Sequence, residues 1–161
     1  MSKVTHIDEN GHAIMVDISE KEVTERVAEA TGKITLSKEA YEIVINHQNK
    51  KGDVLTIAEI AGIMGSKKTS ELIPLCHQIK LEKVNLTFKP FENEGKYGFI
   101  AHSLAKTSDK SGVEMEALMA VEIGLITIYD MCKAVDKKMV ISDIHLLKKS
   151  GGKSGEFRWE D

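Results

Sequence analysis

One long segment with helical character, from Ser111 to Ala134, constrains the fold of this chain more than any other feature. Ser111 and Glu114 stand at the S-x-x-E spacing of a capping box, in which the two side chains satisfy backbone donors at a helix start. The pattern therefore predicts a helix that begins at this box and runs to about Ala134. Carboxylates and lysines lie among its apolar residues, and a buried charge is costly unless it is paired or used. The same helix is therefore a candidate functional site.

A strand and two shorter helices are predicted before the long helix. Apolar residues are set among polar ones from 15 to 36, which favours a strand. Ser37 is expected to cap a helix that ends at Lys50-Lys51-Gly52, because lysines suit the negative end of the helix dipole and glycine suits a left-handed cap. Asp53 is expected to cap the next helix, from 54 to about 68.

A hairpin and a final strand complete the pattern. Residues 81–88 alternate between apolar and polar, residues 97–105 form a second strand, and the turn at 92–96 joins the two. Residues 139–147 are expected to form the last strand. The order is strand, helix pair, hairpin, helix, strand, which is the β-α-β-β-α-β plan with one helix doubled. It predicts an α+β, ferredoxin-like sandwich with an antiparallel sheet.

Length and composition bound the other possibilities. At 161 residues the chain is expected to hold one domain, residues 14–155, with a flexible polar arm at 1–13 and a short tail at 156–161. The net charge of −3 speaks against a general nucleic-acid binder. No apolar run reaches the roughly 18 residues of a membrane-spanning helix. The N-terminus also lacks the apolar core of a signal peptide, so a cytoplasmic protein without a membrane partner is expected.

The cysteines give no sign of a disulfide or a metal site. Cys76 and Cys132 are the two cysteines of the chain, and neither belongs to a CxxC pair. Cys76 precedes His77, but adjacent side chains and one distant thiol make a poor zinc ligand set. No metal site is expected.

Asp130 and Lys133 are the strongest candidates for chemistry, because they are neighbours at i and i+3 on the long helix. They form either a plain surface ion pair or, beside Tyr129 and Cys132, a carboxylate–ammonium pair in apolar surroundings that exchanges protons near neutral pH. Glu116 lies on the same side of the helix but 14 residues earlier, which is about 21 Å away. One small ligand cannot touch both ends, so a site that uses both must draw on two subunits.

Two residues outside the long helix have both a structural and a functional interpretation. His77 is either a packed loop histidine or a phosphate ligand and proton carrier. Lys51 is either a helix-end lysine or a ligand-binding cation. The sequence alone leaves both alternatives open.

The run Gly151-Gly152-Lys153-Ser154 has the composition of a phosphate loop. The P-loop pattern needs glycine at the position of Leu147 and a helix after the loop, so a P-loop NTPase is not expected. A glycine-rich segment with Lys149 and Lys153 can still fold over an anion through its backbone N–H groups.

Four sequence blocks resemble the signatures of a known family. They are residues 72–77 (LIPLCH), 112–118 (GVEMEAL), 129–135 (YDMCKAV) and 149–155 (KSGGKSG). In this order, and over nearly the whole chain, they are similar to the blocks of the cyclic pyranopterin monophosphate synthase family, the MoaC family of molybdenum cofactor biosynthesis.

The resemblance implies an activity and an assembly. It implies a lyase with a ferredoxin-like subunit, assembled as a homohexamer (a trimer of dimers) with active sites at the dimer interfaces. The implied substrate is 3′,8-cyclo-7,8-dihydroguanosine 5′-triphosphate, which a partner radical enzyme makes, and the products are cyclic pyranopterin monophosphate and pyrophosphate. No redox step is involved, so no cofactor is expected beyond a divalent cation that can accompany the triphosphate.

The resemblance also assigns roles to residues. Asp130 is implied as the catalytic acid/base, with Lys133 as its neighbour in proton transfer. The substrate-binding positions it implies are Leu75, Cys76, His77, Glu114, Met115, Glu116, Lys51 and Lys149, with Lys153 as a further triphosphate candidate. Gln78 replaces a usual proline, while Ser111 and Met119 each replace a usual threonine. None of these three departures touches the acid/base pair.

Two other functions stay open from the residues alone. A non-catalytic, oligomeric nucleotide-binding module of the same fold would bind phosphates without turnover, because fold does not fix function. A purely structural oligomer would leave Lys51, His77 and Lys149 scattered over the surface. The intact Asp130–Lys133 pair favours the enzyme.

Overall fold

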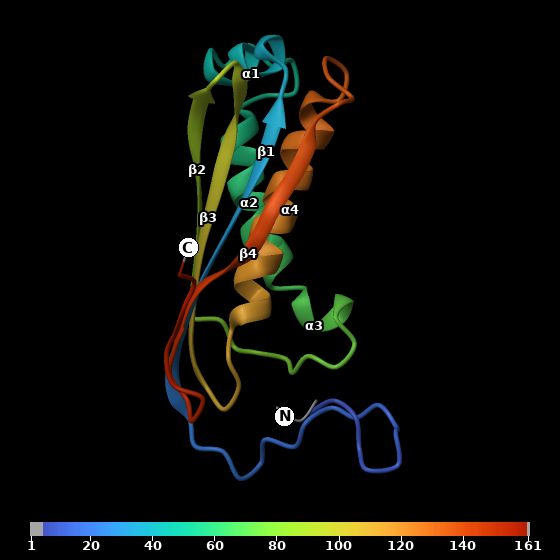
Figure 1. Cartoon of the computed structure of the whole chain (residues 1–161), viewed down its shortest axis with the longest axis vertical. Coiled ribbons are helices and arrows are strands. Elements are labelled where there is room, and N and C mark those ends of the chain that lie inside the picture. Colours follow the sequence, from blue (N-terminus) through green and yellow to red (C-terminus); the bar gives the residue numbers. More distant parts are fainter. Residues whose placement is uncertain (1–4, 161) are drawn as a thin grey trace.

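The computed structural model describes residues 5–160, which form one antiparallel sheet with the long helices packed on one of its faces (Figure 1). The elements are β1 (Thr24–Leu36), α1 (Lys38–Ile45), α2 (Val54–Ser66), α3 (Thr69–Leu72), β2 (Lys83–Asn93), β3 (Lys96–Asp109), α4 (Glu114–Cys132), β4 (Val140–Ser150) and β5 (Phe157–Arg158). The strands lie in the order β2-β3-β1-β4-β5, and each neighbouring pair is antiparallel. This confirms the predicted ferredoxin-like α+β fold with one helix doubled.

The hairpin of β2 and β3 turns where the sequence predicts it. Glu94 and Gly95 both have positive φ, at 50° and 74°, which is the backbone of a two-residue turn that matches the twist of paired strands. β3 then pairs along the whole of β1, from Thr24–Asp109 to Leu36–Tyr97. β1 is therefore a central strand, with β4 on its other side.

The core lies between the sheet and α4. The buried side chains of Ile34 and Phe99 come from β1 and β3, and they belong to the same cluster as Ile128 of α4. α2 packs beside α4 (Figure 1). A Cβ atom at Gly62 of α2 would collide with the carbonyl oxygen of Ala120. The two helices approach so closely because this position carries no side chain.

Both predicted N-cap residues are present, Ser37 for α1 and Asp53 for α2. The side chains of Ser37 and Asp53 accept hydrogen bonds from the backbone N–H groups of Ala40 and Thr56, at 3.2 and 3.1 Å. The predicted end of the first helix is wrong, since α1 stops at Ile45, before the Lys50–Gly52 run. The predicted start of the first strand is also too early: residues 15–23 contain no strand, and β1 begins at Thr24.

The predicted capping box at Ser111 and Glu114 is wrong. α4 begins at Glu114 itself, with Val113 as the N-cap residue and no side-chain hydrogen bond at the cap. The Glu114 carboxylate instead forms an ion pair with Lys149 of β4, with 3.1 Å between its Oε1 and the lysine Nζ. Glu114 therefore pairs with Lys149, which is distant in sequence, and does not cap its own helix.

The two ends of the chain differ in their structure. Of the predicted arm, residues 1–4 lie outside the described part, and Ile7 and Ala13 form an isolated bridge. At the other end, the predicted tail contains β5, which pairs with β4 and was not predicted from the sequence. Residue 161 is not described. No helix within residues 5–160 is long and apolar enough to cross a membrane.

Candidate active site

Asp130, Lys133 and Lys51 meet at the C-terminal end of α4. Lys133 donates a hydrogen bond from Nζ to Oδ1 of Asp130 at 2.6 Å. Lys51, in the connection between α1 and α2, donates to the backbone carbonyl of Asp130 at 3.1 Å, and its Nζ lies 3.6 Å from Oδ2. The two carboxylate oxygens therefore face two different ammonium groups.

The Asp130–Lys133 pair of this cluster is exposed and charged in the single chain. The hydrogen bond from Lys133, followed by the charges of Lys133 and Lys51, lowers the pKa of the Asp130 carboxyl from its usual value. The same hydrogen bond and the Asp130 charge raise the pKa of Lys133. At neutral pH the pair is thus a carboxylate and an ammonium.

The prediction that apolar neighbours shift the pKa of Asp130 toward neutral pH is wrong for the single chain. Its side chain is 57% exposed. Met131 and Cys132 are buried, but successive helix residues point about 100° apart. Asp130 therefore faces solvent while its neighbours face the core.

An apolar hollow lies beside this cluster. It has a volume of about 400 Å³, and its lining includes Ile43, Lys51, Met131 and Val135. Such a surface, with Lys50 and Lys51 also in its lining, suits a flat ring with polar edges.

A second cluster gathers at the N-terminal end of α4. The predicted substrate-binding residues that line this hollow of about 190 Å³ are Leu75, Cys76, His77, Glu114, Met115 and Glu116. The loop after α3 supplies the first three, and the first turn of α4 supplies the rest. His77 lies with its Nε2 2.7 Å from the carbonyl oxygen of Val16, so the histidine is held from the segment before β1.

Glu116 is the buried carboxyl of this second cluster. It is 4% exposed, and burial, together with the charge of Glu114, raises its pKa to about 7. Burial also raises the pKa of the Cys76 thiol, with a contribution from the Glu116 charge. Glu116 is therefore a carboxyl group that can gain or lose a proton near neutral pH.

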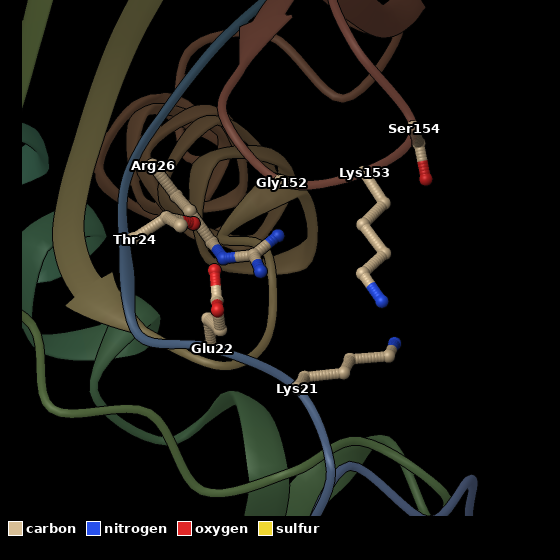
Figure 2. A pocket seen from close by; sticks show the side chains of 7 residues that line it. All are labelled: Lys21, Glu22, Thr24, Arg26, Gly152, Lys153 and Ser154. Atoms are coloured by element: carbon tan, nitrogen blue, oxygen red, sulfur yellow. The ribbon is translucent and has the colours of Figure 1, made fainter.

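The two lysines predicted in the C-terminal segment, Lys149 and Lys153, lie in different places. Lys149 joins the second cluster through its ion pair with Glu114. Lys153 instead lines another hollow, together with Lys21, which precedes β1, and Arg26 of β1 (Figure 2). Lys21 and Arg26 were not identified in the sequence, because each lies outside any motif and far along the chain from Lys153.

The two clusters do not meet within one chain. Glu116 lies in the first turn of α4 and Asp130 in its last turn, so the helix separates them by about 21 Å. Within residues 5–160 no group of three or more His, Cys, Asp or Glu side chains is arranged to hold a metal ion. The site is thus two half-sites of different character, one cationic and exposed, the other with a buried carboxyl.

The chain resembles known proteins over nearly all of its length. A family model described as "MoaC family" matches residues 15–152. The chain belongs to the MoaC family. This MoaC-family chain is 55% identical to a protein of Helicobacter pylori (strain HPAG1) over 154 residues, 96% of each chain. It is 52% identical to a protein of Helicobacter hepaticus (strain ATCC 51449 / 3B1) and 48% identical to one of Staphylococcus carnosus (strain TM300), over 99% of each chain in both cases.

All three relatives are named cyclic pyranopterin monophosphate synthase. The match to the MoaC family covers β1 through β4 and both half-sites, and it ends at Gly152. β5 and the residues around it lie beyond the matched range.

Proposed function

We propose that this MoaC-family chain converts 3′,8-cyclo-7,8-dihydroguanosine 5′-triphosphate to cyclic pyranopterin monophosphate and pyrophosphate, an early step of molybdenum cofactor biosynthesis. The observation that carries the proposal is the near-full-length likeness to proteins named for this synthesis, at about half identity. The cluster of Asp130, Lys133 and Lys51 also supports the proposal, because its side chains suit the chemistry of this reaction.

Asp130 and Lys133 are the proposed proton-transfer pair. Forming the pyranopterin requires breaking and remaking C–N bonds, and each of these steps needs a proton donor or acceptor. Asp130 enters as a carboxylate and Lys133 as an ammonium, so one can accept a proton and the other can donate one. Covering the pair with substrate would remove water and bring their proton affinities closer together.

The active site is proposed to form between two subunits. In a dimer that places the Asp130 end of one α4 against the Glu116 end of another, both half-sites contact one substrate molecule. A homohexamer, a trimer of such dimers, is the proposed assembly, acting in the cytoplasm. An exposed apolar stripe of Ile57, Ile60 and Met64 on α2 supports association with a second copy.

Closing the cyclic phosphate expels pyrophosphate. A hydroxyl oxygen bonds to the α-phosphorus, its proton is taken up by a base, and the bond to the leaving pyrophosphate breaks. Cations stabilise the negative charge on the leaving group, and Lys51, Lys149 and Lys153 are the proposed source. The reaction exchanges no electrons, so no redox cofactor is proposed; a divalent cation can enter with the triphosphate.

The test is turnover by the purified chain. Incubation with the cyclised dihydro-GTP should release pyrophosphate and a cyclic pyranopterin monophosphate in equal amounts, measured by a pyrophosphate assay and mass spectrometry. Asp130→Asn serves as the control that keeps the side-chain shape and removes the base. Binding of the nucleotide without release of pyrophosphate would overturn the proposal and identify a non-catalytic nucleotide-binding module instead.

A further inference from the structure

The last turn of α4 contains two carbonyl groups that have no backbone partner. The backbone N–H groups that follow the helix donate to the carbonyl groups of Tyr129 and Cys132. Within residues 5–160, no backbone N–H donates to the carbonyl oxygen of Asp130 or of Met131. The end of a helix leaves such carbonyl groups to side chains or water. The partners of these two must therefore come from elsewhere.

Both carbonyl groups accept hydrogen bonds from one short connection, residues 46–53 between α1 and α2. Lys51 donates from Nζ to the carbonyl oxygen of Asp130 at 3.1 Å, and Asn49 donates from Nδ2 to that of Met131 at 3.0 Å. α1 and this connection lie at the end of the molecule at which α4 ends (Figure 1). The connection thus closes the last turn of α4 with an ammonium group and an amide.

The Asn49 amide uses both of its ends. While Nδ2 donates to Met131, Oδ1 accepts from the backbone N–H of Lys51 at 2.8 Å. The backbone carbonyl of Asn49 also accepts from the N–H of Gly52 at 3.1 Å, which closes a turn over residues 49–52. A carbonyl oxygen only accepts and a backbone N–H only donates, so each end of the amide has the kind of partner it needs. Asn49 therefore holds the backbone of Lys51 against α4.

The side chain of Lys51 does not keep its own position. It is 49% exposed, and its Nζ lies 3.6 Å from Oδ2 of Asp130. An exposed ion pair of this kind contributes little by itself, because a flexible lysine loses side-chain freedom when its ammonium group is held. Fixing the backbone that carries the side chain lowers this cost. The tie through Asn49 therefore favours the contact between Lys51 and Asp130.

The position of Lys51 matters to the carboxylate of the proposed proton-transfer pair. The hydrogen bond and the charge of Lys133 lower the pKa of Asp130 most, and the charge of Lys51 lowers it further. Asn49 lines the apolar hollow beside the cluster, but both ends of its amide are occupied by backbone groups. Its effect on Asp130 therefore passes through Lys51.

We propose that Asn49 is a positioning residue for the reaction: its amide ties the backbone of Lys51 to the last turn of α4 and so holds the Lys51 ammonium group at Asp130. This role rests on the proposed function for the reaction that it serves. The placement of Lys51 does not depend on turnover, so it can be measured separately.

Acetylation of the folded chain with a small amount of acetic anhydride, followed by peptide mass spectrometry, tests the placement of Lys51. An Nζ that donates to Asp130 must leave this contact before it can attack the reagent. Asn49→Leu keeps about the same side-chain volume and removes both hydrogen bonds, so Lys51 should react about fivefold faster, as expected for the loss of a hydrogen bond. Lys96, at the start of β3, is the internal reference. An unchanged ratio of Lys51 to Lys96 acetylation would overturn the proposal.

Two further variants control this comparison. Asn85→Leu makes the same change at an exposed position of β2, and it should keep the wild-type acetylation of Lys51. Asn49→Ala removes the amide without adding a large apolar side chain, and it should behave as Asn49→Leu does. Thermal unfolding confirms that each variant is folded, so a defect particular to leucine does not decide the result. Faster acetylation of Lys51 in Asn85→Leu as well would overturn the role of Asn49.

A double-mutant cycle with Lys51→Ala tests whether Asn49 acts through this lysine. Asn49→Leu should lower kcat/KM for the cyclised nucleotide about fivefold when Lys51 is present. It should have no further effect in a Lys51→Ala chain, because no ammonium group remains to be placed. An equal loss in both backgrounds would overturn the positioning role, since Asn49 would then support the fold or contact the substrate directly.

The two measurements separate this role from the proposed function. Faster acetylation of Lys51 in Asn49→Leu, in a protein that shows no turnover, would refute the proposed function and leave Asn49 as the anchor of Lys51. Turnover by the wild type, with unchanged acetylation of Lys51 and an additive cycle, would refute the positioning role alone.

Discussion

At the scale of single residues, the carboxylate of Asp130 is the group on which the proposed chemistry depends. Its two oxygens face Lys133 and Lys51, and its side chain makes no contact that the core requires. An exposed polar residue of this kind is one whose loss alters activity far more than stability.

Asp130→Asn should reduce turnover about 100-fold or more, because the amide keeps the shape and cannot act as a base. The melting temperature should stay within about 2 °C of the wild type. Glu39→Gln, the same change at an exposed position of α1, should leave both quantities unchanged. Steady-state pyrophosphate release measures the turnover, and thermal unfolding measures the melting temperature. Near-normal turnover of Asp130→Asn would show that Asp130 is an ion-pair partner and not the base.

Glu116 makes a separate prediction about pH, because its pKa is raised from 4.5 to about 7 in the folded chain. Below pH 4.5 the folded and unfolded chains both hold its proton. Between about pH 4.5 and 7 only the unfolded chain loses it, so the free energy of unfolding should fall as pH rises through this window, by at most about 3 kcal/mol.

Glu116→Gln should remove this fall, since glutamine carries no titrating proton. Urea unfolding of both proteins at pH 5 and pH 8, at one fixed protein concentration, compares the two slopes. Parallel pH profiles for the wild type and the variant would show that Glu116 has an ordinary pKa.

At the scale of elements, the packing of α2 on α4 depends on glycine at the crossing. Gly62→Ala places a methyl group against the Ala120 carbonyl and the Leu86 side chain, and overpacking of this kind costs roughly 1–3 kcal/mol. Helix propensity alone would instead stabilise the alanine variant by about 1 kcal/mol. The sign of the change in urea unfolding therefore decides whether the close helix contact governs this position.

The local elements were predictable from sequence, and the elements set by distant contacts were not. The hairpin turn at Glu94-Gly95 and the caps at Ser37 and Asp53 depend on neighbouring residues, so their signals lie within a few positions. The Ser111–Glu114 box failed because Lys149, from another strand, pairs with the Glu114 carboxylate. β5 is only two residues long, and its pairing exists only because β4 is already in place.

In the site, too, only the features set by residues on one element were predictable from the sequence. Asp130 and Lys133 were found because they share one helix at a fixed spacing, and the Glu116–Asp130 separation followed from helix rise alone. The surroundings of Asp130 were wrong, since flanking sequence does not tell which way a helix face points. Lys21 and Arg26 were missed because they meet Lys153 only in the folded chain.

At the scale of the whole molecule, one chain presents half-sites at opposite ends of α4. Neither half holds all the groups that the proposed reaction needs: Asp130 and Lys133 lie at one end, and Glu116 and Lys149 at the other. We therefore expect a second copy whose α4 supplies the missing end, so that the active site is shared between two subunits.

Subunit mixing tests that claim most directly. Glu116→Ala and Asp130→Asn chains, each inactive alone, are mixed under conditions in which native mass spectrometry confirms that subunits exchange. Each mixed interface should contain one site with an intact Glu116 and an intact Asp130, so pyrophosphate release should return to about a quarter of the wild-type rate at equal mixing. A mixture that exchanges subunits and remains as inactive as its two components would contradict the shared site.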